Sequence, residues 1–180
     1  MRLCRNSLAV TFAAVVMLTA CGQTAPADRL VEGSAFPDID LTGLNRPDAS
    51  LASYHGRIVI LNIWATWCGA CLHELPALQG LSEQLDPEHF AVVGMSVDSE
   101  RYAANEFMRE RQIMFDNYID VEQHIARDIL AVRVYPDTFV ISPNGTLWRK
   151  IAGERDWSQP AVVEALRAAR RGDRSGLLQL

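Results

Sequence analysis

The chain has 180 residues, of which 49% are hydrophobic, 22% charged and 8% aromatic. This composition excludes a disordered, collagen-like or coiled-coil protein, and the length predicts one domain that can bury a core without disulfide support. The formal charge of −5 argues against a nucleic-acid-binding protein, which is normally basic, so we expect no nucleic-acid partner. Four cysteines suggest two disulfides at first, but their positions favour a different interpretation.

The N-terminus has the pattern of a secretion signal that ends in a lipid attachment site. Two arginines precede the apolar run 8–18, which is too short to cross a bilayer core (roughly 20 residues are needed) but suits a signal peptide. Residues 18–22 (LTACG) are similar to a bacterial lipobox, in which the cysteine carries the lipid. We therefore predict a lipoprotein signal peptide at 1–20 and lipidation of Cys21. The alternative is a plain signal peptide that leaves this cysteine as a free thiol.

The residues that follow predict a membrane-attached domain. Residues 21–33 contain a proline and several small or polar residues, which is typical of a tether. We expect the folded domain at 34–171 and a C-terminal tail at 172–180. Lipid chains on Cys21 hold a protein stably on a membrane, so the predicted location is the cell envelope, on the periplasm-facing side. Loss of residues 1–20 removes two arginines and changes the net charge from −5 to −7.

In the first half of the domain, apolar patterns predict three strands and a helix. Residues 36–41 alternate apolar and polar side chains, as a half-buried strand does. The continuous runs 58–64 and 90–97 predict strands that are buried on both faces. Between them, apolar residues from Cys71 to Leu85 are spaced by three and four positions, which predicts a helix.

Capping and turn signals predict the second half. Asp98 and Ser99 offer an N-cap for a helix at about 100–111, and 115–119 predicts a short strand. Asp120 and Gln123 resemble a capping box that opens a helix to about residue 130.

The last segment predicts a hairpin and a helix. The runs 138–141 and 147–151 flank Pro143-Asn144-Gly145-Thr146, and Ser158 offers a cap for a helix to about residue 171. Strands that alternate with helices and end in a hairpin predict an α/β sandwich with a mixed central sheet.

The chemistry is expected in a C-x-x-C motif between the predicted central strand and its helix. Cys68 lies at the expected helix N-terminus, where free N–H groups and the helix dipole favour a thiolate, so it is the candidate nucleophile. Cys71 lies about one turn later and is the candidate resolving thiol, while Gly69 is expected to allow a tight turn.

Two other uses of a C-x-x-C motif, a structural zinc site and a structural disulfide, fit this sequence less well. A structural zinc needs two further ligands, and no second cysteine pair exists. A purely structural disulfide over this spacing constrains little of the unfolded chain. We therefore expect no metal, and since no flavin or nicotinamide motif is present, no cofactor besides the dithiol itself.

Four features of the sequence form an ordered set: 61–71 (LNIWATWCGAC), Pro76, 134–141 (VYPDTFVI) and the opening Phe36-Pro37. This set resembles the TlpA/ResA-type family of membrane-anchored thiol-disulfide oxidoreductases. The resemblance implies a thioredoxin-like three-layer α/β/α sandwich and the reduction of disulfides in client proteins, for example in cytochrome c maturation. It also implies a membrane thiol donor that returns electrons to the dithiol.

The resemblance further implies roles for single residues. Pro136 matches the family's cis-proline, which faces the cysteines, and Trp67, Gly69, Ala70 and Tyr135 complete the expected client-binding site. Tyr135 is bulkier than the usual residue before this proline, and the following Asp137 is expected to add charge to the groove floor.

Glu74 matches an acidic position of the ResA-like branch. Partly buried beside the thiols, it would have a raised pKa and take the proton that Cys71 loses. The alternative is an ordinary solvated glutamate on the helix. Asn62 stands where cytoplasmic thioredoxin has a buried aspartate, and an amide cannot take a proton.

Two other functions and the direction of the reaction stay open. A peroxiredoxin-like peroxidase usually has a threonine three residues before its reactive cysteine, where this chain has Ala65. A copper-carrier protein of this fold uses C-x-x-x-C and a distal histidine, whereas this spacing is C-x-x-C. Reductases and oxidases share the scaffold and differ in reduction potential.

Overall fold

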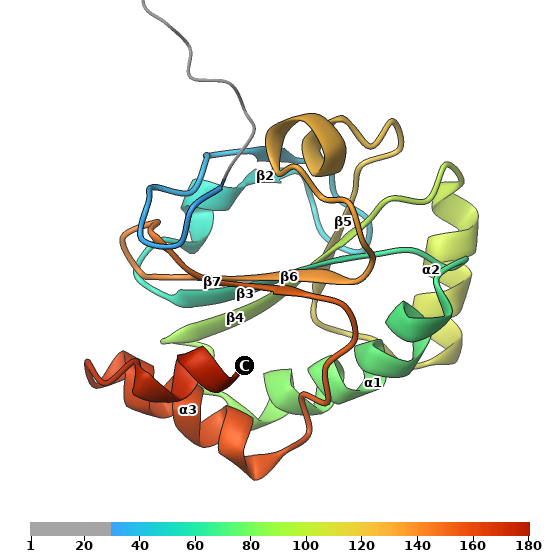
Figure 1. The fold of residues 1–180 in the computed structure, drawn as a ribbon. Helices are drawn as coiled ribbons and strands as arrows, with labels where there is room; N and C mark the ends of the chain where they lie inside the picture. Colours follow the sequence, from blue (N-terminus) through green and yellow to red (C-terminus); the bar gives the residue numbers. More distant parts are fainter. Residues whose placement is uncertain (1–29) are drawn as a thin grey trace, which may run out of the picture.

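A computed structural model describes residues 30–180, and its centre is a five-stranded sheet (Figure 1). The strand order is β5-β4-β3-β6-β7. The strands are β3 (Ile58–Trp64), β4 (Phe90–Ser96), β5 (Asp116–Ile119), β6 (Asp137–Ile141) and β7 (Leu147–Ala152). The helices are α1 (Gly69–Gln84), α2 (Arg101–Glu110) and α3 (Pro160–Arg170). The predicted signal peptide and Cys21 lie outside the described residues.

The sheet is mixed, as predicted. β3 is central, pairs in parallel with β4 and antiparallel with β6, and every one of its residues is buried. β4 pairs in parallel with β5, while β6 and β7 form the predicted hairpin. The continuous apolar run of β3 therefore reflects burial on both faces.

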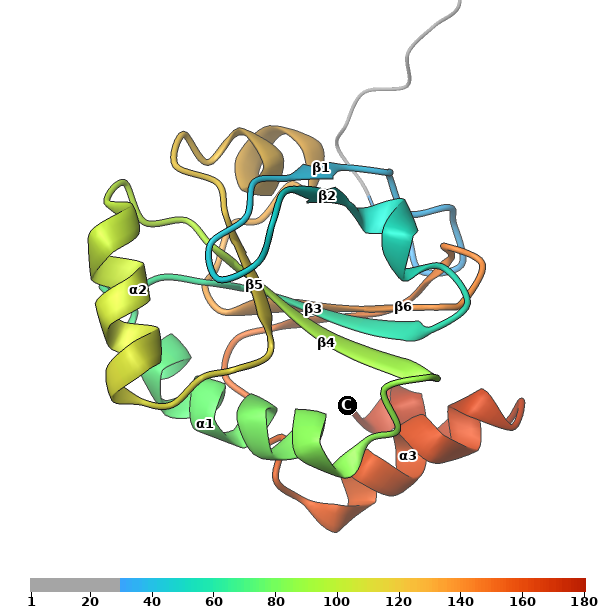
Figure 2. The same cartoon turned by 180° about the vertical axis from the view of Figure 1, so that it is seen from behind.

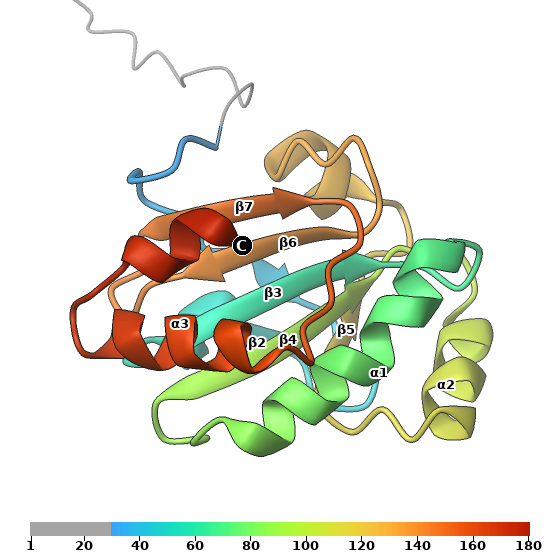
Figure 3. The ribbon, with the colours of Figure 1, turned by 60° about the horizontal axis from the view of Figure 1, so that its bottom comes forward.

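Two apolar clusters separate the sheet from the layers on either side. Ile58, Ile60 and Trp64 of β3 pack in the cluster that faces the helices, whereas Val59, Leu61 and Ile63 pack on the other face. All three helices cover the first face, as Figure 3 shows. The opposite face is covered by β1 (Asp40–Leu41), β2 (Ala49–Ser50) and the short helical turns η1 (Leu51–Tyr54) and η2 (Ile125–Ile129), visible in Figure 2. The result is the three-layer sandwich that was expected.

Several local predictions were wrong at their boundaries. Only Asp40–Leu41 of the predicted strand 36–41 pairs as a strand, because the Phe36 N–H donates to the Gly145 carbonyl in the β6–β7 turn, next to a single bridge between Ala35 and Thr146. The Asp98 side chain does not cap α2, which begins at Arg101 without a side-chain cap, since its carboxylate is used elsewhere. Ser158 does not cap α3 either, as its hydroxyl donates to Asp156 and Pro160 begins the helix.

The predicted helix from 120 to 130 is reduced to the π-helical turn η2. Gln123 has a left-handed backbone with φ of 59°, which interrupts a regular helix there. Asp120 instead accepts a hydrogen bond from the Ala126 N–H, so it closes a loop and not a capping box.

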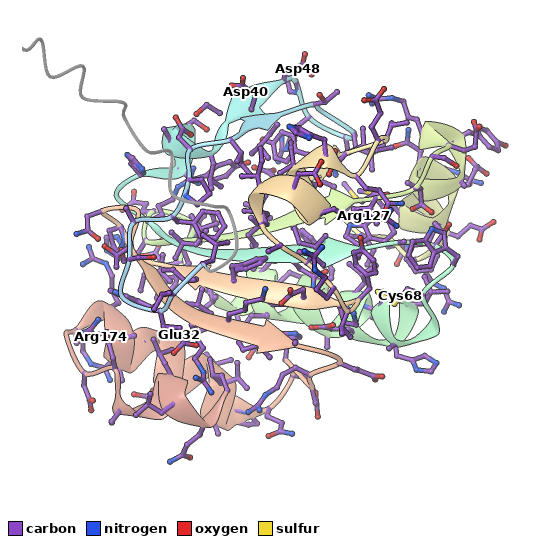
Figure 4. All side chains as sticks on the ribbon, turned by 45° about the horizontal axis from the view of Figure 1, so that its top comes forward. Glu32, Asp40, Asp48, Cys68, Arg127 and Arg174 are labelled. Atoms are coloured by element: carbon purple, nitrogen blue, oxygen red, sulfur yellow. A yellow bond between two sulfur atoms is a disulfide. The ribbon has the colours of Figure 1, made fainter. Side chains whose placement is uncertain are left out.

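The two ends of the sheet are distinct. β3 ends next to Cys68, while the first described residues attach at the other end, where the Gly33 N–H donates to the Leu147 carbonyl at the start of β7. Figure 4 shows Glu32 and Arg174 at the end of the molecule away from Cys68. At the C-terminus, η3 (Ser175–Gln179) packs against α3 and buries Leu177. Within residues 30–180, no helix has the length and apolar character to span a membrane.

Candidate active site

The two cysteines of the motif form a disulfide at the N-terminus of α1 (Figure 4). Their Cα atoms are 5.3 Å apart. Cys68 is the N-cap of the helix, and its Sγ accepts a hydrogen bond of 3.2 Å from the Cys71 N–H. The predicted position at the helix start is confirmed, and it is the position that stabilises a thiolate.

The two sulfur-bearing residues differ in exposure. Cys68 is half-buried and Cys71 is fully buried within the cluster between the sheet and the helices. A client disulfide can therefore approach the first cysteine from solvent, whereas the second is reached only from inside the domain. This asymmetry is what a nucleophile and its resolving partner need.

A buried carboxylate holds the loop that leads into the motif. Asp98, two residues after the end of β4, accepts a hydrogen bond of 2.6 Å from the Thr66 hydroxyl and further bonds of 3.1 Å from the Thr66 N–H. The Ser96 hydroxyl donates to the same carboxylate at 2.7 Å. The sequence interpretation missed this role, because Asp98 also fits a helix cap and nothing local links it to residue 66.

Glu74 lies one turn after Cys71 on α1, and its side chain is 2% exposed. Burial raises the pKa of this carboxyl to about 7, the hydrogen bond that its Oε1 accepts from the Trp157 indole lowers it, and the charge of Glu154 raises it. Its other oxygen, Oε2, has no hydrogen-bond partner among the described residues. The alternative of a solvated glutamate is wrong, whereas the proton-transfer role stays a prediction.

An aromatic pair borders the disulfide. Trp67 is 59% exposed, and its ring meets the Tyr135 ring edge-on with centroids 5.4 Å apart. The Tyr135–Pro136 peptide bond is cis. The Tyr135 hydroxyl donates to Gln123 at 3.3 Å, which ties this ring to the loop before η2. These side chains lie on the two segments that the sequence predicted to face each other.

Two expectations about this surface need correction. A Cβ at Gly69 would meet no atom within 4 Å, and the residue has no left-handed backbone, so the tight turn does not require glycine. Asp137 is 1% exposed and pairs with Lys150 at 3.1 Å, so its carboxylate does not reach the groove floor. Burial raises the pKa of Asp137 to about 6, against the lowering effect of Lys150.

Asn62 and Ala65 are both buried near the end of β3. The Asn62 amide donates to the Thr138 hydroxyl at 2.9 Å on the neighbouring strand, and its Oδ1 has no partner among residues 30–180. Ala65 is fully buried. Because this residue is an alanine, the position three residues before Cys68 carries no hydroxyl. In the part of the chain that the structure describes, no cluster of three or more His, Cys, Asp or Glu side chains is placed to hold a metal ion.

Known proteins that are similar in sequence to this chain are named thiol-disulfide oxidoreductases. ResA, a thiol-disulfide oxidoreductase of Bacillus subtilis strain 168, is 25% identical over 168 residues, which cover 90% of this chain and 92% of the relative. ResA of Geobacillus kaustophilus is 28% identical over 145 residues, which cover 77% of this chain and 83% of the relative.

Two solved structures share the fold of this chain and are described as proteins of thiol-disulfide exchange. A Chlorobium tepidum protein described as the thiol:disulfide interchange protein DsbE superposes with a TM-score of 0.69 at 27% identity, over 80% of this chain and 98% of that one. A Corynebacterium glutamicum structure, described as a secreted thiol-disulfide isomerase, gives 0.62 at 25% identity, over 68% and 78%.

The thioredoxin-like sandwich and its C-x-x-C disulfide define a thiol-disulfide oxidoreductase. The AhpC/TSA family model matches residues 33–150, and the chain belongs to that family. The predicted resemblance to ResA is confirmed.

Proposed function

We propose that this protein is a cell-envelope reductase of disulfides in client proteins. The observation that carries the proposal is the asymmetry of the dithiol: a half-buried Cys68 that caps α1 and a fully buried Cys71. In the reduced protein, the Cys68 thiolate attacks one sulfur of the client disulfide, and the other client sulfur leaves as a thiolate, which takes a proton from water. Cys71 then attacks Cys68 in the mixed disulfide, which releases the second client thiol and forms the Cys68–Cys71 disulfide.

Glu74 is the proposed proton acceptor for the second step. Cys71 is buried and must lose its proton before its sulfur can attack, so a base inside the domain is needed. Glu74 is one helical turn away, and residues with this spacing are neighbours on a helix surface. Its pKa of about 7 suits an acid or base that exchanges protons near neutral pH. The proton then passes to the client thiolate that leaves.

The aromatic border suggests where clients bind. Trp67 and Val134 are exposed by 59% and 54%, and Tyr135 lies between the exposed segment and the core. An extended client segment that carries a cysteine would lie along these side chains and along Pro136, with Gly69 and Ala70 leaving room at the motif. The resemblance to the TlpA/ResA type supports apocytochrome c as one such client.

The proposed location is the periplasm-facing membrane surface, with lipid on Cys21 and a membrane thiol protein as the electron donor. Residues 30–35 attach at the end of the sheet away from Cys68. A tether from that end leaves the dithiol free to meet clients and donor. The secreted relative from Corynebacterium glutamicum also supports a place outside the cytoplasm.

Trapping with the Cys71→Ser variant tests the function. Cells that express this variant should accumulate a mixed disulfide between Cys68 and a client, which dithiothreitol reverses and mass spectrometry identifies. The matched control is Cys68→Ser, which retains one motif cysteine but should trap at least tenfold less, because its remaining thiol is buried. Equal trapping by both variants would contradict the assignment of Cys68 as nucleophile.

The reduction potential tests the direction of the reaction. A reductase should have a reduction potential of about −270 mV, the value of thioredoxin, measured by equilibration with glutathione. A reduction potential of about −120 mV, typical of a strong periplasmic oxidant, would overturn the assignment as a reductase.

A further inference from the structure

The loop between β7 and α3 brings a tryptophan to the buried carboxyl of the site. Trp157 is fully buried in the cluster that also contains Cys71 and Leu75 of α1. Its indole N–H donates a hydrogen bond to Glu74 Oε1. Among the described residues this is the only hydrogen bond to the Glu74 side chain, and it comes from 83 positions away in the sequence.

The charged groups around Glu74 do not replace this donor. On α1 itself, Cys71 lies one turn before Glu74. The His73 side chain is exposed, and its Nδ1 lies 3.9 Å from Oε1 of Glu154. From the β7–α3 loop, Glu154 adds a negative charge that opposes ionisation of Glu74. No ion pair to Glu74 exists among residues 30–180, because the bridges found there involve other carboxylates.

We propose that Trp157 is a positioning residue for the thiol-disulfide reaction. Its indole N–H holds one oxygen of Glu74 and leaves the second oxygen, Oε2, free to take the proton of Cys71. This inference rests on the proposed role of Glu74 as proton acceptor. In this role Trp157 acts through the carboxylate of Glu74.

The donor also sets the pH at which Glu74 can act. A hydrogen bond to the ionised form of a carboxyl favours that form, and in a buried site the effect is large because water does not compete. Without the indole N–H, Glu74 would hold its proton to a higher pH. It would then be protonated at neutral pH and unable to accept the Cys71 proton.

The Trp157→Phe variant retains an aromatic ring but removes the donor. The reduced protein is mixed with 5,5′-dithiobis(2-nitrobenzoate) in a stopped-flow instrument, where attack by Cys68 gives the first thionitrobenzoate and attack by Cys71 the second. We expect the pH midpoint of the second phase to rise by about 1 to 2 pH units and its rate at pH 7 to fall about tenfold, with the first phase unchanged.

The matched control is Trp148→Phe. Trp148 is a partly buried indole on β7 that packs against Arg174, and within residues 30–180 it makes no hydrogen bond to Glu74. This control should leave both phases within a factor of two of the unmodified protein. An unchanged second-phase midpoint in Trp157→Phe would overturn the proposal.

A separate titration distinguishes failure of this inference from failure of the proposed function. The carboxyl carbon of Glu74 in ¹³C-glutamate-labelled protein is followed by NMR over the pH range, and Glu74→Gln assigns the signal. An upward shift of its midpoint in Trp157→Phe, together with the altered second phase, supports both proposals. A shifted carboxyl midpoint with an unaltered second phase overturns Glu74 as the proton acceptor, and with it the catalytic use of Trp157. An unshifted carboxyl overturns the positioning role itself.

If Trp157→Phe does not fold, the Trp157 side chain of the unmodified protein provides a second test. The indole Nε1–H resonance of Trp157 should move with pH around the Glu74 midpoint in the unmodified protein and stay constant in Glu74→Gln. A resonance that is constant in both proteins would overturn the proposal.

Discussion

Two buried carboxylates flank the redox motif, and they differ in how their oxygens are satisfied. Asp98 is 3% exposed and accepts hydrogen bonds from the Thr66 N–H, the Thr66 hydroxyl and the Ser96 hydroxyl. Glu74 is 2% exposed and has one donor, the Trp157 indole, while its second oxygen has no partner among the described residues. The two carboxylates are therefore about equally buried, but Asp98 accepts hydrogen bonds from three groups and Glu74 from one.

The difference separates structural from chemical use of a carboxylate. Several donors fix the position of a carboxylate, so the Asp98 carboxylate serves to hold the loop before Cys68. A carboxyl with a single donor keeps much of its desolvation penalty, and burial accordingly raises the pKa of Glu74 to about 7. An acid of this kind gains and loses its proton near neutral pH.

The largest predicted effect is on the satisfied carboxylate. Asp98→Ala leaves the Thr66 N–H and two hydroxyl groups without their acceptor, so we expect the free energy of unfolding to fall by about 3 kcal/mol at pH 7. Urea denaturation of the oxidised protein measures this change. The control is Asp156→Ala, an exposed carboxylate that also accepts from a serine, Ser158, and it should cost less than about 1 kcal/mol. Equal losses would contradict the structural role of Asp98.

Glu74→Gln should raise the free energy of unfolding, whereas Asp98→Ala should lower it, and the gain should depend on pH. The folded-state pKa of Glu74 lies above its ordinary value of 4.5, so the folded protein binds more protons than the unfolded chain between about pH 4.5 and 7. Glu74 therefore lowers stability as the pH rises through this range, by about 3 kcal/mol in total. Glu74→Gln removes that loss, so urea denaturation should find the variant as stable as the unmodified protein at pH 4 and more stable at pH 8. A constant difference over the range would contradict the raised pKa.

A third buried carboxylate lies between these two cases. Asp137 has one oxygen paired with Lys150 and one without a partner among residues 30–180. Its pKa is raised to about 6, so it is mostly neutral at pH 5 and ionised at pH 8. Lys150→Met should therefore lower the free energy of unfolding by about 1–2 kcal/mol at pH 8 and by much less at pH 5. In the control Arg149→Met, which breaks the more exposed pair with Glu32, no such pH dependence is expected.

The sequence could predict the parts of this site that depend on neighbouring residues, but not the contacts between residues far apart in the chain. The helix start at Cys68 and the central strand depend on local patterns, and both were predicted correctly. The partners of Glu74 and Asp98 could not be predicted, because Trp157 is 83 positions and Thr66 is 32 positions away, and only the folded sheet brings them together. Local rules also assigned Asp98 and Ser158 to helix caps, where competing polar partners prevailed.

The smallest predicted effect concerns the exposed charge next to Glu74. Glu154 raises the pKa of Glu74 through its negative charge, but its side chain is about half exposed and water screens the interaction. Glu154→Gln should lower the midpoint of the Glu74 titration by roughly 0.3 pH units in the ¹³C experiment. Because the Debye length falls to about 3 Å at 1 M salt, the difference should vanish there. The Trp157→Phe shift should persist under the same conditions, since a buried hydrogen bond is screened much less than an exposed charge. Two neighbouring loop residues would thus affect one carboxyl in opposite directions, and only one of the two effects would depend on salt.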